Sequence, residues 1–229
     1  MVTPISTPDN DTTPTFTFNS TEAGTITYGG SCSSASTTAV SGNNTKTFST
    51  LADGTYSDCT IYVTDSGSNM SNVLPIPEFI VDTIDPILSE VTPVPAFGND
   101  STPDYTFSTN EAGDIDYSGA CSSTTTSALA GAVTVTFNSL FDGTYTNCFV
   151  RIEDAAGNDS DWLEVSDFSI NTVAPTVNLT FNPIPSNPTN VQTYHVVAGF
   201  TENVTGVADT DFTTVNGSIS NFNALSGAT

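Results

Sequence analysis

The chain has 229 residues and a formal net charge of −23, because 25 acidic side chains face only two basic ones, Lys46 and Arg151. Nucleic-acid binding depends on lysine and arginine side chains that neutralise phosphates, so this charge excludes nucleic acids and anionic membranes as partners. Apolar residues still recur in strand-like alternation between turn signals. We therefore expect the chain to fold despite its acidity.

An internal repeat organises the chain. Residues 51–65 read LADGTYSDCTIYVTD, and residues 140–154 read LFDGTYTNCFVRIED. The two segments are 89 positions apart, and the same offset relates Cys32 to Cys121. Two modules therefore align without a gap, which indicates an array of similar units.

The period divides the chain into three predicted modules. Module 1 spans residues 1–85, module 2 spans residues 86–174 and module 3 covers residues 175–229. Met1 aligns with Glu90, so we interpret the first strand of module 1 as clipped. Module 3 has no cysteine and ends before any DGTY segment. It is predicted to be of a different subtype, either truncated or completed by another segment.

Short strands separated by turns account for most of module 1. Alternating apolar residues predict strands at residues 15–18, 25–28, around 45–48 and at 76–81. Module 2 repeats this pattern, and no stretch shows a helical period. About seven short strands in roughly ninety residues are typical of an antiparallel β-sandwich. The predicted fold class is therefore all-β, with sandwiches in tandem.

The repeated DGTY segment predicts a strand that contains an irregularity. Cys59 and Val63 share one face, because side chains of a strand alternate with a period of two. Tyr56 has the opposite parity. It reaches the same core only if one residue is absorbed near Ser57 and Asp58, which predicts a β-bulge there.

The four cysteines fall as one pair in each module, at positions 32 and 59 and at positions 121 and 148. Their spacing does not match a zinc knuckle, so the sequence predicts the disulfides Cys32–Cys59 and Cys121–Cys148. Disulfides persist in oxidising compartments, which indicates a secreted or cell-surface protein. No apolar run is long enough to cross a bilayer, so no membrane insertion is expected in this segment.

The residues offer little for catalysis. His195 is the single histidine, and it lies in a predicted strand at residues 193–200. No nucleophile elbow accompanies it, so an ordinary sheet position is the better interpretation. A further strand is predicted at residues 211–215. We expect no enzymatic activity.

Three features together resemble one family: the DGTY strand, the D-x-x-G-N turn at residues 154–158 and the D-T-x-x-P linker at residues 82–86. They resemble the tandem bacterial immunoglobulin-like (Ig-like, Big-type) domains of large secreted or cell-surface adhesins and extracellular fibres. Module 3, with FTENVTG at residues 200–206, looks like a related type. The resemblance implies Ig-like sandwiches that serve as a structural stalk or spacer.

The same resemblance assigns the cysteines to strands. Cys32 follows the strand that corresponds to strand C, and Cys59 lies in strand F. The bridge therefore joins neighbours within one sheet, whereas the disulfide of antibody domains crosses between sheets from strand B to strand F. We expect it to act as a local staple.

A calcium site is predicted at the junction of modules 1 and 2. In an Ig-like sandwich the B–C and F–G loops lie nearest the preceding linker, so Glu111 and Asp154 are expected to approach Asp82 and Asp85. Clustered carboxylate oxygens suit Ca²⁺, and a bound ion stiffens a junction. In the alternative interpretation, Asp154 only caps its own Gly-Asn turn and the linker aspartates are solvated.

Two other functions stay open at this point. The chain is alternatively a glycan- or protein-binding module of a surface protein, or an accessory spacer of a secreted hydrolase. We interpret Trp162 as a packing residue and not as a sugar contact, because its counterpart in module 1 is the apolar residue Val73. The expected partners are neighbouring modules of the same chain. The open edges of module 3 also predict self-association into a fibre by strand donation.

Overall fold

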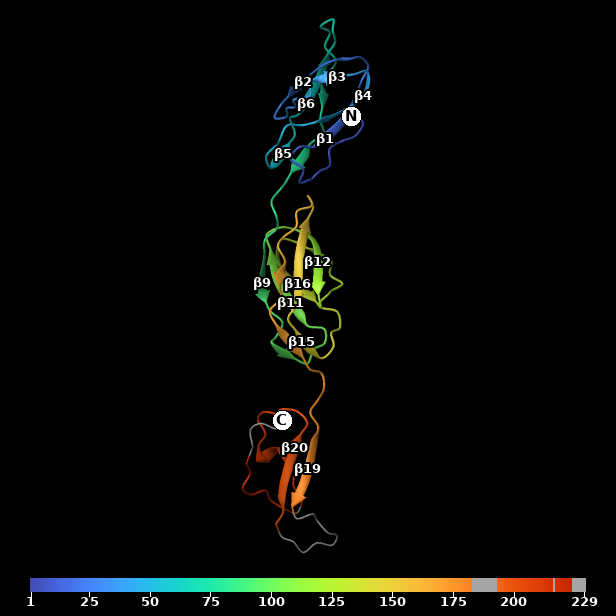
Figure 1. The fold of residues 1–229 in the computed structure, drawn as a ribbon. Helices are drawn as coiled ribbons and strands as arrows, with labels where there is room; N and C mark the ends of the chain where they lie inside the picture. The colour runs from blue at the N-terminus through green and yellow to red at the C-terminus, as the bar shows by residue number, and fades with distance from the viewer. Residues whose placement is uncertain (183–192, 216, 224–229) are drawn as a thin grey trace. The chain divides into compact units, whose positions relative to one another are not determined.

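The computed structural model of the chain describes residues 1–182, 193–215 and 217–223 (Figure 1). These residues form short β-strands, almost all paired antiparallel, and a single 3-10 turn. The all-β fold class is thus confirmed. The chain separates into two compact units, Met1–Asn171 and Thr172–Thr229, and the first contains both disulfide-bonded modules. The predicted module boundaries stay a prediction.

Module 1 is built from a four-stranded sheet in the order β3-β2-β6-β7 and from the pairs β1-β4 and β5-β8. Its strands are β1 (Thr15–Ser20), β2 (Gly24–Gly29), β3 (Thr38–Ala39), β4 (Gly42–Thr47), β5 (Gly54–Tyr56), β6 (Thr60–Thr64), β7 (Leu74–Pro75) and β8 (Phe79–Val81). The segment before β1 adds two isolated bridges, an antiparallel one between Thr3 and Thr17 and a parallel one between Asp9 and Val81.

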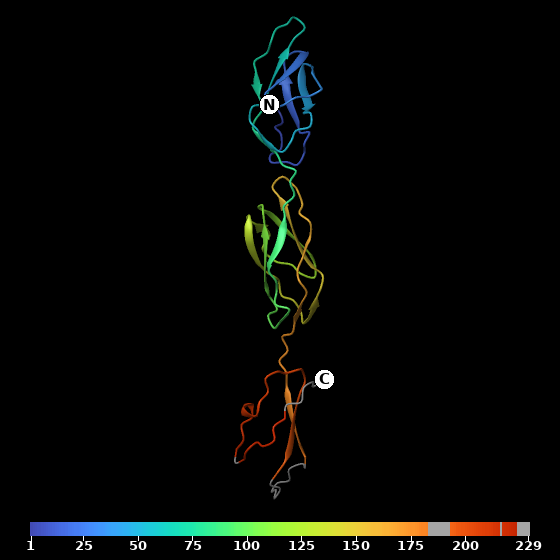
Figure 2. The same cartoon turned by 90° about the vertical axis from the view of Figure 1, so that its left-hand side faces the viewer.

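Module 2 repeats this arrangement and adds two strands at its start, β9 and β10. Its strands are β9 (Leu88–Thr92), β10 (Phe97–Gly98), β11 (Asp104–Thr109), β12 (Gly113–Gly119), β13 (Ser127–Ala128), β14 (Gly131–Thr136), β15 (Gly143–Tyr145), β16 (Cys148–Asp154), β17 (Leu163–Glu164) and β18 (Phe168–Ile170). The sheets run β13-β12-β16-β17, β14-β11-β9 and β10-β18-β15, and only β10 and β18 are parallel. Figure 2 shows these strands from a second direction.

Each module has its own buried core. Phe16, Phe48 and Phe79 lie almost fully buried in module 1, and residues 89 positions later take their places in module 2. The core rings of Phe48 and Phe79 stack with centroids 6.0 Å apart. Because the inward positions of both modules are filled with aromatic and branched side chains, each sandwich excludes water by itself.

The irregularity expected in the DGTY strand takes the form of a break. Strand β5 ends at Tyr56 and β6 begins at Thr60, and in module 2 a similar gap separates β15 from β16. Tyr56 packs on the core and stacks on Phe79, while its hydroxyl donates to the Ala52 carbonyl over 2.8 Å. Tyr145 makes the same bond in module 2. These bonds resemble the tyrosine corner of Ig-like sandwiches, although each tyrosine here lies three residues before its cysteine and not two.

The two predicted disulfides are present. Cys32 is bonded to Cys59 and Cys121 to Cys148, with Cα–Cα distances of 5.3 and 5.1 Å. Cys32 follows β2 and Cys59 precedes β6, and these strands are antiparallel neighbours in one sheet. Each bridge is therefore the local staple that the sequence led us to expect.

The second unit contains a hairpin of β19 (Val177–Asn182) and β20 (His195–Phe200). Strand β20 agrees with the sequence-based prediction, whereas β19 was not predicted. The strand predicted at residues 211–215 is wrong, because a 3-10 turn, η1 (Asp209–Asp211), ends there and the following residues form no strand. The Asp211 carboxylate accepts a hydrogen bond from the Ala208 amide, which favours the turn. Completion of module 3 by another segment stays a prediction.

Tyr105 is the fully buried tyrosine in the core of module 2, at the position that Phe16 occupies in module 1. Its side chain is fully buried, and its hydroxyl has no hydrogen-bond partner in the described part of the chain. Burial, with a smaller contribution from the Glu90 carboxylate, raises the pKa of Tyr105. A buried hydroxyl without a partner costs free energy on folding.

Replacing Tyr105 with phenylalanine is expected to stabilise module 2 by about 1 kcal/mol, because the change removes this unsatisfied group without altering the ring. Urea denaturation followed by circular dichroism measures the difference. The reverse substitution in module 1, Phe16→Tyr, is expected to lower stability. A loss of stability in Tyr105→Phe would contradict the assignment of an unpaired hydroxyl.

Candidate metal centre

Three carboxylates meet where the linker 82–86 enters module 2. Asp82, Glu111 and Asp154 each offer a carboxylate oxygen, and these oxygens lie within 4.8 Å of one another. Asp82 comes from the linker, Glu111 from the loop between β11 and β12, and Asp154 from the end of β16. The structure thus brings together three of the four residues proposed from the sequence.

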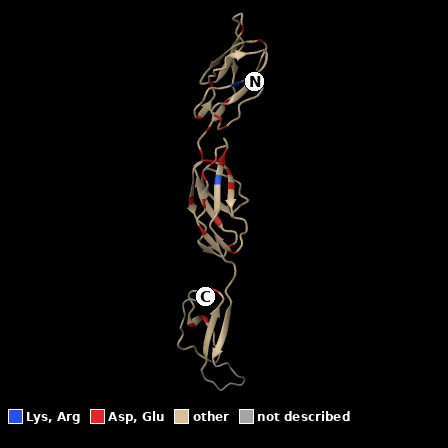
Figure 3. Cartoon of the chain, viewed as in Figure 1, with Lys and Arg blue, Asp and Glu red and all other residues tan. Residues whose placement is uncertain are grey.

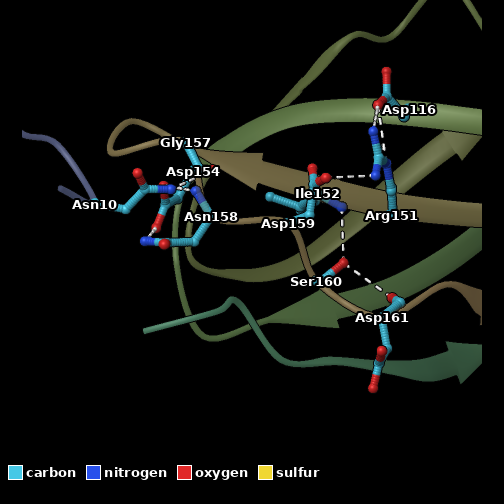
Figure 4. Close-up of polar contacts among 10 residues, drawn as sticks. All are labelled: Asn10, Asp116, Arg151, Ile152, Asp154, Gly157, Asn158, Asp159, Ser160 and Asp161. Carbon is cyan, nitrogen blue, oxygen red and sulfur yellow. Dashed lines mark hydrogen bonds and ion pairs between the residues drawn. The ribbon is translucent and has the colours of Figure 1, made fainter. Parts of the chain in front are cut away.

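Asp154 is held in place by its own turn. One of its carboxylate oxygens accepts hydrogen bonds from the amides of Ala156 and Asn158, over 2.8 and 2.9 Å. The other accepts from the side-chain amide of Asn158, over 2.8 Å (Figure 4). The turn-capping role weighed in the sequence is therefore present, and the same carboxylate also belongs to the junction cluster.

The surroundings of Glu111 disfavour its charged form. Partial burial raises its pKa above the usual value, and the charges of Asp82 and Asp154 raise it further. The side-chain amide of Asn110 donates to Glu111 over 3.0 Å and partly offsets these effects. Burial is thus the larger cause of the raised pKa, and the two neighbouring negative charges add to it.

The fourth predicted residue is not part of the cluster. Asp85 is exposed and lies outside the group of three carboxylates. It lines a surface cleft of about 240 Å³ together with Trp162. Asp11 of module 1 is not part of the cluster either, and its carboxylate caps its own turn by accepting from the amide and hydroxyl of Thr13.

Direct hydrogen bonds join the two modules beside the carboxylates. The Asn158 side-chain amide donates to the main-chain carbonyl of Asp82 over 2.9 Å as well as to Asp154. The side chain of Asn10 donates to the Gly157 carbonyl over 2.9 Å. The main chain of Asn10 donates in turn to the Ala156 carbonyl over 3.1 Å.

The sequence-based reasoning missed both asparagines, although each has a signal. Asn158 closes the turn at residues 154–158, and Asn69 takes the same position in the module 1 segment DSGSN. Asn10 has the counterpart Asn99 in module 2. The repetition of asparagine at equivalent loop positions is the signal by which both residues could have been found.

Basic side chains do not neutralise the cluster. Within the described residues the two ion pairs both belong to Arg151, which binds Asp116 and Asp159 over 2.8 and 2.6 Å. Its guanidinium also lies 5.0 Å from the ring centre of Trp162. Figure 3 shows how few basic residues accompany the acidic ones. Three carboxylates with no basic side chain paired to them in the described part of the chain are chemically suited to a hard divalent ion such as Ca²⁺.

Comparison with known proteins gives one structural likeness. No family model matches the chain, and no curated protein matches it. The chain is similar to the fibronectin(III)-like modules of Clostridium thermocellum CbhA, with 13% sequence identity and a TM-score of 0.39. The similarity covers 72% of this chain and 92% of the other, and at this identity it concerns the fold alone. No helix among the described residues is long and apolar enough to cross a membrane.

Proposed function

We propose that this chain is a spacer segment of an extracellular protein, built from tandem Ig-like modules of the bacterial type found in surface adhesins and fibres. One observation carries the proposal: the Asn158 amide bonds simultaneously to the turn of module 2 and to the linker carbonyl of Asp82. Such a bond restricts how one module turns against the next. Neighbouring modules with a restricted angle are what a stalk requires.

The construction of the modules supports this role. The 89-residue register is kept without an insertion, so neither module carries a loop that is lengthened relative to the other. Trp162 is module-specific, but its ring is engaged with Arg151. A disulfide staples each module, as is common for domains that work in oxidising surroundings outside the cytoplasm.

Calcium is the second part of the proposal. Asp82, Glu111 and Asp154 would supply three of the oxygen ligands, and water would complete the six to eight that Ca²⁺ takes. The ion would offset the charges of Asp82 and Asp154, which add to burial in raising the pKa of Glu111. It would also link the linker to two loops of module 2, and thus add to the hydrogen bonds at the junction.

Calcium titration of the whole chain tests this proposal. We expect binding by calorimetry, together with a stabilisation of about 2.7 kcal/mol at a free calcium concentration one hundred times the dissociation constant. Glu111→Gln is expected to abolish both effects, because it removes a charged ligand but leaves the Asp154 turn intact. The matched control is Glu22→Gln, the equivalent position in module 1, which should leave calcium binding unchanged.

Two results would count against calcium at this site. Equal calcium binding in the Glu111→Gln variant and in the unaltered chain would place the ion elsewhere. Complete absence of binding at millimolar calcium would reject the ion altogether and would leave the hydrogen bonds of Asn10 and Asn158 as the fixing element.

A further inference from the structure

The turn at residues 154–158 is the part of module 2 that receives module 1. Its carbonyls at Ala156 and Gly157 accept hydrogen bonds from Asn10, and Asn158 donates back across the junction. Ala156 and Asn158 are only 9% and 6% exposed. The turn therefore offers two acceptors and one donor to its neighbour.

Module 1 contains the same turn at residues 65–69. One carboxylate oxygen of Asp65 accepts from the amides of Gly67 and Asn69, both over 2.8 Å. The other accepts from the side-chain amide of Asn69 over 2.9 Å. The main-chain bond from the Asp65 amide to the Asn69 carbonyl is also repeated in module 2 between Asp154 and Asn158.

The turn at residues 65–69 has the same hydrogen bonds as the turn at residues 154–158 that contacts module 1, but its own surface is exposed. Gly67, Ser68 and Asn69 are all exposed, although the corresponding residues 156 and 158 of module 2 are buried. Ser68 has a φ of 67°, close to the 89° of Gly157, and a residue with a Cβ adopts this region at a cost. The turn is thus already organised for a neighbour, which lowers the entropic cost of docking.

The complementary surface of a module is its opposite end. In module 1 that end presents Asn10, next to the turn in which Asp11 accepts from the amide of Thr13. Module 2 has the same feature, because Asp100 accepts from the amide of Thr102 over 2.8 Å and Asn99 stands where Asn10 does. Each module therefore carries both halves of one contact, a pattern that generates head-to-tail arrays.

We propose that residues 65–69 of module 1 receive another module of this same repeat, which docks through the loop that holds Asn10 in module 1 and Asn99 in module 2. The incoming asparagine donates to the carbonyls at positions 67 and 68, and Asn69 donates to the main chain of the incoming linker. This inference rests on the spacer function proposed above, and it does not require calcium.

A lengthened chain tests the inference. A second copy of residues 1–90 is fused directly to Val2 of the full sequence, so that Glu90 precedes Val2 as it precedes Val91 in the natural chain. Hydrogen exchange is then measured by NMR at the main-chain amide of Asn10 in the added module. We expect this amide to exchange at least roughly tenfold more slowly than in the same chain with Asn69→Ala in the original module 1. That substitution removes the hydrogen bond from Asn69 to the incoming linker, which would otherwise hold the two modules together.

The natural junction provides the matched control. There the amide of the original Asn10 should be protected, and Asn158→Ala should remove that protection. If the original amide is protected and the added one exchanges freely, the inference is overturned while the spacer function stands. If neither amide is protected, the inference and the spacer function both fall.

Discussion

Removing the disulfide of module 2 by the double substitution Cys121→Ala and Cys148→Ala is expected to lower its free energy of unfolding by about 3 to 4 kcal/mol. The bridge closes a loop with a sequence separation of 27, and its loss returns chain entropy to the unfolded state. Both cysteines are buried, so the substitution also removes packing atoms from the core.

Module 1 is the internal control for this experiment. It has a separate core and retains Cys32–Cys59, so its unfolding midpoint should stay unchanged when module 2 loses its bridge. Denaturation with tyrosine and tryptophan fluorescence follows the modules separately, because Trp162 reports on module 2 alone. A loss below about 1 kcal/mol, or an equal shift in both modules, would contradict the staple assignment.

Replacing Gly119 with alanine is expected to destabilise module 2 by about 3 kcal/mol, which combines a backbone cost with a steric one. Gly119 ends β12 with a φ of 80°, a region that costs L-residues about 1 to 2 kcal/mol. A Cβ at this position would also overlap the main-chain carbonyl of Asn147, which accepts a hydrogen bond from the amide of Ala120. The carbonyl cannot withdraw without breaking that bond near the disulfide.

Gly131→Ala separates the two contributions. Gly131 has a φ of 115°, but a Cβ there would meet no atom within 4 Å. Its cost should therefore be the conformational part alone, about 1 to 2 kcal/mol. Thermal unfolding of both variants gives the comparison. Equal destabilisation of the two would show that the close approach to Asn147 carries no penalty.

Much of the fold could be predicted from the sequence because the pattern of each strand and turn occurs in both modules. The alternation in TFTF and the DGTY turn depend on local side-chain periodicity, which determines which face enters a core. The prediction at residues 211–215 failed for a local reason as well. Threonine and valine favour a strand there, but the Asp211 carboxylate captures the Ala208 amide and stabilises a 3-10 turn.

The candidate site was accessible only in part. Glu111 and Asp154 were found because loop positions in a sandwich follow from strand order. Asp85 lies only three residues beyond Asp82, yet its side chain is exposed and lines a different surface. The direction of a linker side chain depends on contacts made across the junction, and no sequence period encodes it.

The hydrogen bonds between modules were not accessible for the same reason. Asn10 and Asn158 are separated by more than 140 residues, and each lies in a polar loop of the kind that is usually solvated. Their hydrogen bonds, to the carbonyls of Ala156, Gly157 and Asp82, form only where the loops of the two modules meet. The repeat shows that such residues recur, and only the assembled modules show what they contact.

Residual dipolar couplings of modules 1 and 2, measured in the full chain with calcium and after chelation, test the proposed spacer junction most directly. With calcium, we expect one alignment tensor to fit both modules. After chelation, or in the Glu111→Gln variant with calcium present, we expect one tensor to fit the two modules less closely, because the hydrogen bonds of Asn10 and Asn158 remain while the ion is lost. Two independent tensors at saturating calcium would show a freely jointed chain and would contradict a junction fixed by Asn10, Asn158 and the three carboxylates.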